Sequence, residues 1–213
     1  MGKVTFNITM SLDGYSAGPN PRADEPLGDG GERLHEWALR SAAWRETHGY
    51  EDGAEDRNSE IVRESTANVG AYLMGRKMFD GGEGPLDESW HGWWGENPPY
   101  GVPVFVLTHH EREPLEMQGG TTFEFVNDGI EPALERARAA AGERDVVIAG
   151  GADVAQQYLR AGLVDEFQVS VAPILLGGGV RLLDGLGSDE IALEADRAVH
   201  TPEATHLRYR VVR

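Results

Sequence analysis

The stretch that decides the fold is residues 146–167, "VVIAGGADVAQQYLRAGLVDEF". It begins with apolar residues typical of a buried strand, breaks at Gly150-Gly151, and continues with the periodicity of an amphipathic helix. A helix N-terminus presents unpaired N–H groups and the positive end of the helix dipole. Because glycine lets a phosphate approach such a backbone closely, this junction predicts an anion-binding turn. The alternative is that the two glycines only allow a tight turn between strand and helix.

A second junction of the same kind lies at "LMGR", residues 73–76, where an apolar strand ends in glycine and a helix begins. In a parallel sheet the carboxyl ends of the strands share one edge, where ligands bind. Two such helix starts side by side predict a site for a pyrophosphate. Arg76 and Lys77 begin the second helix, and Thr108 and His109 end the next strand. Arginine binds phosphate through a two-pronged fork, so this group suits the 2′-phosphate of NADPH. A surface charge in solvent is the alternative for Arg76.

Strands alternate with helices through the middle of the chain, and the last strands follow one another directly. This order predicts a single α/β domain over residues 1–213, with a mostly parallel central sheet, an antiparallel C-terminal hairpin and helices on both faces. Asn127-Asp128 are expected to cap one helix, and Pro132 to lie in its first turn. The expected strands lie within 4–14, 71–74, 102–110, 121–126, 145–151, 165–179 and 191–213, and the expected helices within 32–46, 59–66, 129–143 and 152–162.

Composition excludes several classes of protein. The formal net charge of −17 would repel nucleic acid and anionic membranes. No run of 18 apolar residues and no signal-peptide pattern is found, so we expect no membrane association. The chain has no cysteine, which excludes disulfides and thiolate metal sites and is compatible with a cytoplasmic protein. The histidines lack metal-ligand spacing, so no metal is expected.

Four segments, in their order, carry a resemblance to a known family: "TMSLDGYSAG", "LMGRKMFD", "VFVLTHH" and residues 146–183. Together they resemble the dihydrofolate-reductase-like family, and within it the C-terminal reductase domain of the bifunctional riboflavin-biosynthesis deaminase-reductase. The resemblance covers nearly the whole chain. It implies a dihydrofolate-reductase-like three-layer sandwich, NADPH bound across the carboxyl edge of the sheet, and a homodimer. The first strand lacks the G-x-G-x-x-G fingerprint, so the cofactor would be held in another way.

The resemblance also implies roles for individual residues. The backbone of Ile8 and Thr9 would meet the nicotinamide carboxamide, and the loop 12–18, with Leu12, Ala17 and Gly18, would cover the ring. Gly75, Arg76 and Lys77 would hold adenosine-side phosphates, Thr108 and His109 would lie beside the 2′-phosphate, and Gly150, Gly151, Ala152, Asp153 and Val154 would cradle the pyrophosphate.

Asp13 is the candidate for substrate binding and catalysis. It follows the first strand, where a carboxylate could bind an amino or hydroxyl group or relay a proton. A turn-forming aspartate before Gly14 is the alternative. Trp90 and Trp93, in the loop "SWHGWW", could wall a pocket for a flat substrate ring. A hydrophobic cluster or a dimer contact is the alternative for that loop.

The sequence is compatible with three functions. The first is an NADPH-dependent reductase of a small heterocyclic or sugar-linked substrate, similar to 5-amino-6-(5-phosphoribosylamino)uracil reductase. The stretch "MFDGGEGPLDESW" departs from the "DDP…L…R" pattern of that enzyme, which leaves the substrate open. The second is a true dihydrofolate reductase, which places a carboxylate on its first helix, as Glu32 or Glu36 could be. The third is a non-catalytic NADP-binding module.

Overall fold

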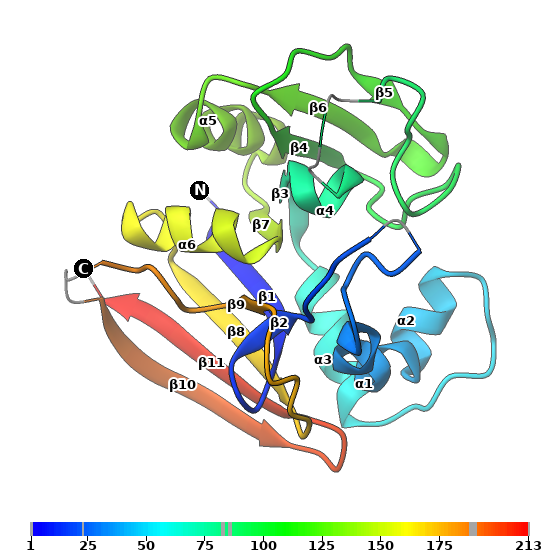
Figure 1. Ribbon diagram of the computed structural model, residues 1–213, viewed down its shortest axis with the longest axis vertical. Helices are drawn as coiled ribbons and strands as arrows, with labels where there is room; N and C mark the ends of the chain where they lie inside the picture. Colours follow the sequence, from blue (N-terminus) through cyan, green and yellow to red (C-terminus); the bar gives the residue numbers. More distant parts are fainter. Residues whose placement is uncertain (1, 23, 82–83, 85–86, 188–190, 213) are drawn as a thin grey trace. The chain divides into compact units, whose positions relative to one another are not determined.

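The computed structural model describes residues 2–22, 24–81, 84, 87–187 and 191–212 (Figure 1). The chain divides into two compact units. Unit 1 comprises Met1–Phe6 and Val69–Val164, and unit 2 comprises Asn7–Asn68 and Asp165–Arg213. The division falls within strand β1 (Val4–Ser11), which contributes residues to both units. Among the described residues, no helix is long and apolar enough to cross a membrane.

Unit 1 is built on a mostly parallel sheet. Its strands neighbour one another in the order β1, β7 (Asp145–Gly150), β3 (Val69–Gly75), β4 (Pro103–Leu107), β6 (Thr122–Val126) and β5 (Leu115–Glu116). All of these pairs are parallel except β5 with β6. Buried runs such as Val104–Val106 fit strands that are covered on both faces. The predicted parallel α/β sheet is therefore confirmed, whereas β5 was not predicted.

The helices of unit 1 are α4 (Arg76–Asp80), α5 (Ile130–Ala141), α6 (Ala152–Arg160) and the short 3-10 turn η2 (Gln118–Gly120). Helix α5 packs against β3, β4 and β7 and buries four small or aliphatic side chains, from Ala133 to Ala141. The hydroxyl of Tyr158 donates a 2.7 Å hydrogen bond to the Ile130 carbonyl, which joins α6 to α5. Pro132 lies in the first turn of α5, as predicted.

The predicted cap of α5 is wrong. Gly129 occupies the N-cap position, and no side chain caps the helix. The Asp128 carboxylate instead accepts a 2.6 Å hydrogen bond from Arg136, two turns into the helix. A long cation within reach competes successfully with the backbone amides for the carboxylate, which a local sequence pattern does not reveal.

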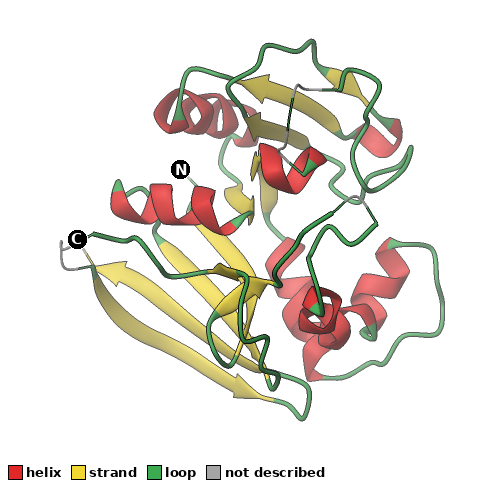
Figure 2. Cartoon of the chain, viewed as in Figure 1, coloured by secondary structure: helices red, strands yellow, loops and turns green. Residues whose placement is uncertain are grey.

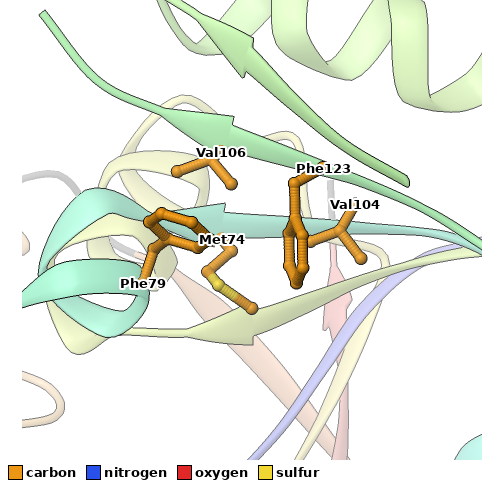
Figure 3. Packing of buried hydrophobic residues seen from close by; sticks show 5 residues of the cluster. All are labelled: Met74, Phe79, Val104, Val106 and Phe123. Atoms are coloured by element: carbon orange, nitrogen blue, oxygen red, sulfur yellow. The ribbon is translucent and has the colours of Figure 1, made fainter. Parts of the chain in front are cut away.

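An aromatic-rich core lies on the α4 side of the unit 1 sheet. Met74, Phe79, Val104, Val106 and Phe123 are buried and point toward one another (Figure 3). The rings of Phe79 and Phe123 meet edge to face with centroids 5.1 Å apart. This cluster fixes the short helix α4, which has too few residues to be stable by itself.

Unit 2 contains the predicted antiparallel C-terminal hairpin. Strand β11 (Thr205–Val212) pairs antiparallel with both β10 (Ala192–His200) and β8 (Glu166–Ala172), and β1 follows β8. A second, two-stranded sheet joins β2 (Tyr15–Ala17) to β9 (Val180–Arg181) and was not predicted. Figure 2 shows the long hairpin and the short strands in yellow.

The single helix predicted over 32–46 is wrong. The structure has three pieces, η1 (Gly31–His35), α1 (Glu36–Leu39) and α2 (Ala42–Thr47). Ser41 adopts an extended conformation, and its hydroxyl accepts a hydrogen bond from the Trp44 amide. A serine in this role starts a new helix and ends the previous one. The short helix predicted over 59–66 is confirmed as α3 (Arg57–Thr66), which Asp56 caps.

A buried polar network ties α3 to the sheet of unit 2. His206 is 1% exposed, and its Nδ1 and Nε2 lie 2.8 Å from Ser170 Oγ and 3.0 Å from Asn58 Oδ1. Because the Asn58 oxygen can only accept, Nε2 carries the proton and Ser170 donates to Nδ1. Burial, followed by the nearby charge of Arg197, lowers the pKa of His206 to about 4. The imidazole is therefore neutral at pH 7 and stabilises the unit as a satisfied hydrogen-bonding group.

Candidate functional site

The two strand-to-helix junctions lie side by side within unit 1. Strands β3 and β7 pair in parallel, with Leu73 opposite Ile148 and Met74 opposite Gly150. Each strand runs directly into a helix, α4 after β3 and α6 after β7. Gly75 and Gly151 are the N-cap residues of these helices, and neither helix has a side-chain cap. The unpaired amides at both helix starts are thus brought to the same edge of the sheet.

The start of α6 combines free donors with free space. A Cβ placed on Gly151 would meet no heavy atom within 4 Å. The Ala155 amide bonds to the Gly151 carbonyl, and no described residue accepts a hydrogen bond from the amides of Ala152, Asp153 or Val154. The peptide bond between Gly150 and Gly151 is cis. The start of α6 thus has three amides without a partner among the described residues and open space at Gly151, two features that the binding of a phosphate requires.

The other two glycines of these junctions serve the fold. A Cβ on Gly75 would lie 2.8 Å from Val154 Cγ2, so glycine lets the two junctions approach each other. Gly150 has a φ of +143°, which other residues rarely adopt, and its Cβ would lie 2.9 Å from Met78 Sδ. The sequence could not distinguish these packing roles from the open position at Gly151.

The predicted phosphate-binding cation Arg76 is engaged within the protein. Its guanidinium lies 2.9 Å from Asp80 and donates to the Gly84 carbonyl, and the side chains of Arg76 and Asp80 are only 12% and 8% exposed. Lys77, the next residue, is exposed. A role for Arg76 toward the 2′-phosphate stays a prediction, and the ion pair with Asp80 gives the side chain a structural task as well.

Thr108 and His109 follow β4, whose Leu107 pairs with Gly75 of β3. Thr108 is buried, and its hydroxyl accepts a 3.1 Å hydrogen bond from the His110 amide. His109 is exposed. The strand register thus places this pair at the edge where α4 begins, with His109 accessible and Thr108 shaping the turn.

The tryptophan-rich loop packs onto the last turn of α4. The indole of Trp90 donates to the Phe79 carbonyl at 2.8 Å, and that of Trp93 donates to the Met78 carbonyl at 2.9 Å. The two rings lie 4.6 Å apart. Arg112 donates to the Trp90 carbonyl and lies over the ring of Phe125. The loop therefore supplies partners for carbonyls at the C-terminus of α4, and a role of Trp90 and Trp93 toward substrate stays a prediction.

In unit 2, Asp13 lies in the turn between β1 and β2. Its carboxylate accepts hydrogen bonds from the Ser11 hydroxyl at 2.5 Å and from the Leu176 and Gly177 amides at 3.2 and 2.7 Å. The Ser11 hydroxyl, followed by these amides, lowers the pKa of Asp13 to about 2. Asp13 is therefore ionised near pH 7 and can accept hydrogen bonds but has no proton to give.

The other predicted nicotinamide-side residues also belong to unit 2. Thr9 is buried and its hydroxyl accepts a 3.1 Å hydrogen bond from the indole of Trp37, whereas Ile8 is partly exposed. Leu12 is 68% exposed. Gly18 is buried, and a Cβ there would overlap the Asp29 carbonyl. Ala17 lies in β2. The structure thus gives Gly18 a packing role and leaves Leu12 exposed to meet a ligand.

Unit 2 also contains a small cavity that the sequence did not reveal. Its volume is about 110 Å³, and its walls include Arg33, Glu36 and Trp37 from the helices, Ile174 from the loop after β8, and Glu203. Glu36, one of the two carboxylates considered for a pterin, lines this cavity but forms an ion pair with Arg40. Glu32 does not line it. The walls come from segments far apart in sequence, so no local pattern could predict the cavity.

No group of three histidines, cysteines or carboxylates that could hold a metal ion is found in the described part of the chain.

Comparison with known proteins identifies the family. Residues 2–207 match the RibD C-terminal domain. The chain belongs to this family. Among curated proteins, the chain is 26% identical over 121 residues to the protein YyaP of Bacillus subtilis, a match that covers 52% of this chain and 57% of YyaP. The chain thus spans a little over half the length of this relative.

Solved structures show the same fold. A putative riboflavin biosynthesis protein from Shewanella sp. PV-4 superposes with a TM-score of 0.63 at 22% identity, covering 99% of both chains. A diaminohydroxyphosphoribosylaminopyrimidine deaminase/5-amino-6-(5-phosphoribosylamino)uracil reductase from Thermotoga maritima superposes with a TM-score of 0.58 at 14% identity, covering 99% of this chain and 57% of that chain. The dihydrofolate-reductase-like fold of the RibD C-terminal domain, predicted from the motifs, is confirmed.

Proposed function

We propose that the chain is an NADPH-dependent reductase that transfers hydride to a C=N or C=O carbon of a small heterocyclic or sugar-linked substrate. The observation that carries this proposal is the start of α6, where three amides have no partner among the described residues and a side chain at Gly151 would meet no atom. Membership of the RibD C-terminal domain family supports it, as does the fold shared with the Thermotoga maritima deaminase/reductase.

The residues of unit 1 fit the phosphates of a dinucleotide. Amides of Ala152, Asp153 and Val154 would bind the pyrophosphate oxygens, because a helix N-terminus favours negative charge. At the neighbouring strand ends, exposed Lys77 can add positive charge and exposed His109 can add a hydrogen-bond donor. With a net charge of −17, the protein attracts an anion only through such local groups.

Bound NADPH supplies the hydride, and the chain supplies orientation and exclusion of water. The backbone of Ile8 and Thr9 would meet the nicotinamide, with Leu12 covering the ring; these assignments rest on the resemblance of the motifs and on the exposure of Leu12. Trp90 and Trp93 are the proposed contacts to a flat substrate ring, an assignment that rests on the aromatic character of their loop.

The riboflavin-type reduction is preferred to dihydrofolate reduction. The match of residues 2–207 to the RibD C-terminal domain supports this preference. Tight binding of an antifolate such as methotrexate would reverse this preference.

We further propose that the protein is a cytoplasmic homodimer. Strand β10 is the edge of the sheet in unit 2 and is largely exposed. Leu193 of β10 is 46% exposed, and an apolar side chain on an edge strand favours association with a second copy. Light scattering coupled to size-exclusion chromatography would measure the mass, and a monomer would contradict this part of the proposal.

The deciding experiment is the titration of purified protein with NADPH and NADH in parallel, followed by fluorescence of its five tryptophans. We expect micromolar binding of NADPH and clearly weaker binding of NADH. Aminopyrimidine and pterin substrates would then be screened for oxidation of the bound cofactor. Failure of folded protein to bind either nucleotide would overturn the proposed function, whereas binding without turnover of any substrate would favour a non-catalytic module.

A further inference from the structure

We propose that Asp13 is a positioning residue, whose carboxylate holds the loop after β8 against the turn after β1, and that it does not relay a proton. The consequence for catalysis rests on the proposed reductase function. The structural role does not, because it concerns contacts within unit 2 alone.

Both oxygens of the Asp13 carboxylate are already used by the protein. Oδ1 accepts from Ser11 Oγ at 2.5 Å and from the Leu176 amide at 3.2 Å, and Oδ2 accepts from the Gly177 amide at 2.7 Å. Hydrogen bonds to an ionised acceptor are roughly twice as strong as bonds between neutral groups. A carboxylate with three donors of this kind is held in one orientation and is poorly available to a substrate.

Ser11 holds the carboxylate of Asp13 in place through a hydrogen bond. Its side chain is fully buried, and its hydroxyl donates to Asp13 while accepting a 3.0 Å hydrogen bond from the Tyr15 amide. The Gly14 amide closes the turn by bonding to the Ser11 carbonyl, and Gly14 has a φ of +90°. The turn is thus rigid enough to present Asp13 at a defined place.

Strand β9 pairs with β2, and Asp13 binds the centre of the loop that precedes β9. Its ends are tied by main-chain bonds, from the Leu12 amide to the Ile174 carbonyl and from the Leu182 amide to the Gly14 carbonyl. Between these ties lie three consecutive glycines, residues 177–179, which give the backbone wide conformational freedom. The bonds from Leu176 and Gly177 to Asp13 fall in this flexible part. Removing the carboxylate should therefore loosen the centre of the loop and leave its ends attached.

The loop after β8 and the turn after β1 each carry an exposed leucine. Leu12 and Leu175 are 68% and 67% exposed, and the main-chain bond from Leu12 to Ile174 holds the two leucines on adjoining segments. The ordered loop thus presents a small apolar surface beside the Asp13 turn. A change at Asp13 would alter the position of the loop and so weaken the binding of a ring packed on this surface.

Hydrogen bonds keep the Asp13 carboxylate ionised, first the one from the Ser11 hydroxyl and then those from the Gly177 and Leu176 amides. The pKa of Asp13 is about 2, so the carboxylate remains charged throughout the range in which a reductase is assayed. A proton relay requires a group that gains and loses its proton near the working pH.

Hydrogen–deuterium exchange of the full chain tests the proposal without any cofactor. In Asp13→Ala we expect the amides of residues 176–179 to exchange about tenfold faster or more, because two charge-assisted hydrogen bonds are lost. Ser11→Ala should show a smaller increase, and Asp13→Asn a partial one, since an amide oxygen can still accept. Asp128→Asn, which removes an exposed carboxylate in unit 1, is the matched control and should leave this loop unchanged.

Activity separates positioning from proton transfer. For a positioning residue, Asp13→Asn should raise KM more than it lowers kcat, and the pH profile of kcat should keep its shape. Unchanged exchange of residues 176–179 in both Asp13 variants would overturn the proposal. So would a pH-dependent limb of kcat that disappears in Asp13→Asn while the loop stays protected. If the protein lacks reductase activity, the exchange data still decide the structural claim.

Discussion

The start of α6 in unit 1 and the glycine-rich loop after β8 in unit 2 use the same chemical group in opposite ways. At α6 the amides of Ala152–Val154 have no partner among the described residues, and the space in front of Gly151 is open. In unit 2 the amides of Leu176 and Gly177 are bound by the protein's own carboxylate, Asp13. Backbone N–H groups attract an anion in both places. Where the chain provides the anion, the hydrogen bonds stabilise the fold, and where it does not, we propose a binding site for a phosphate.

The first test, with the largest expected effect, asks whether Arg76 serves only its ion pair with Asp80 or also binds a ligand. Arg76→Ala removes the ion pair that Arg76 forms with Asp80, a carboxylate that is only 8% exposed. We expect the free energy of unfolding to fall by about 3–5 kcal/mol, measured by urea denaturation. The double variant Arg76→Met with Asp80→Leu should recover much of this loss.

The same variant tests the prediction about the 2′-phosphate. If Arg76 also binds that group, NADPH affinity should fall much more than NADH affinity at a temperature where the variant is folded. An equal loss for both nucleotides would confine Arg76 to its role in the fold.

The second test examines the network around His206, where the polar groups are hydrogen-bonded within the protein. The unfolded chain takes up a proton near the ordinary pKa of 6.5, whereas the folded protein resists it until about pH 4. The stability that neutral His206 contributes is complete above pH 6.5 and is lost as the pH falls toward 4, by about 3 kcal/mol in all.

Unfolding free energies measured by urea between pH 7 and 4 would check this expectation. His206→Gln should reduce the slope by about one proton in that window. Arg197, Arg208, Glu64 and Glu203 are the charged groups nearest the network and are retained in the variant. The exposed His110→Gln is the control, and an equal change of slope in both variants would contradict the assignment.

The third test fills the open space. Gly151→Val should raise the Kd of both NADPH and NADH about a hundredfold, because its side chain occupies the volume where phosphate oxygens would lie. Gly151→Ala should have a smaller effect. Thermal unfolding should change little, since a Cβ at Gly151 meets no atom of the protein. Unchanged nucleotide binding in a folded Gly151→Val would show that the open amides do not hold the phosphates.

The smallest expected effect concerns a charge at the open helix start. Asp153 is exposed in the first turn of α6, and its carboxylate accepts a hydrogen bond from Gln157. A negative charge there opposes a phosphate, so Asp153→Asn should tighten NADPH binding by roughly two- to fivefold at low salt. The gain should shrink as salt is added. Weaker binding in this variant would indicate that the carboxylate itself contacts the cofactor.

Prediction from sequence succeeded where local pattern and backbone geometry coincide. The buried run before Gly150 and the amphipathic run after it gave β7 and α6, and the same argument gave β3 and α4. The final segments gave the hairpin β10–β11. The local hydrophobic pattern of each of these segments predicts its secondary structure, so no knowledge of distant contacts is needed.

Prediction failed where a distant or specific partner decides. The helix over 32–46 was broken by the capping hydroxyl of Ser41, and Asp128 pairs with Arg136 where it was expected to cap α5. The sheet of β2 and β9 joins residues more than 160 positions apart. No role was predicted for His206, because the residues near it in the sequence do not indicate that Asn58 and Ser170 are its hydrogen-bond partners.

The sequence by itself determined that this chain is an α/β protein with two glycine-ended strands running into helices at one edge of a parallel sheet. These features follow from hydrophobic period and from the conformational freedom of glycine, which are properties of adjacent residues. The tertiary structure alone decided which polar groups are already satisfied. It paired Arg76 with Asp80 and gave Asp13 the amides of Leu176 and Gly177, and it left those of Ala152–Val154 open. Hydrogen bonds between distant segments form only when packing brings those segments together, so neighbouring residues do not reveal which polar groups are satisfied.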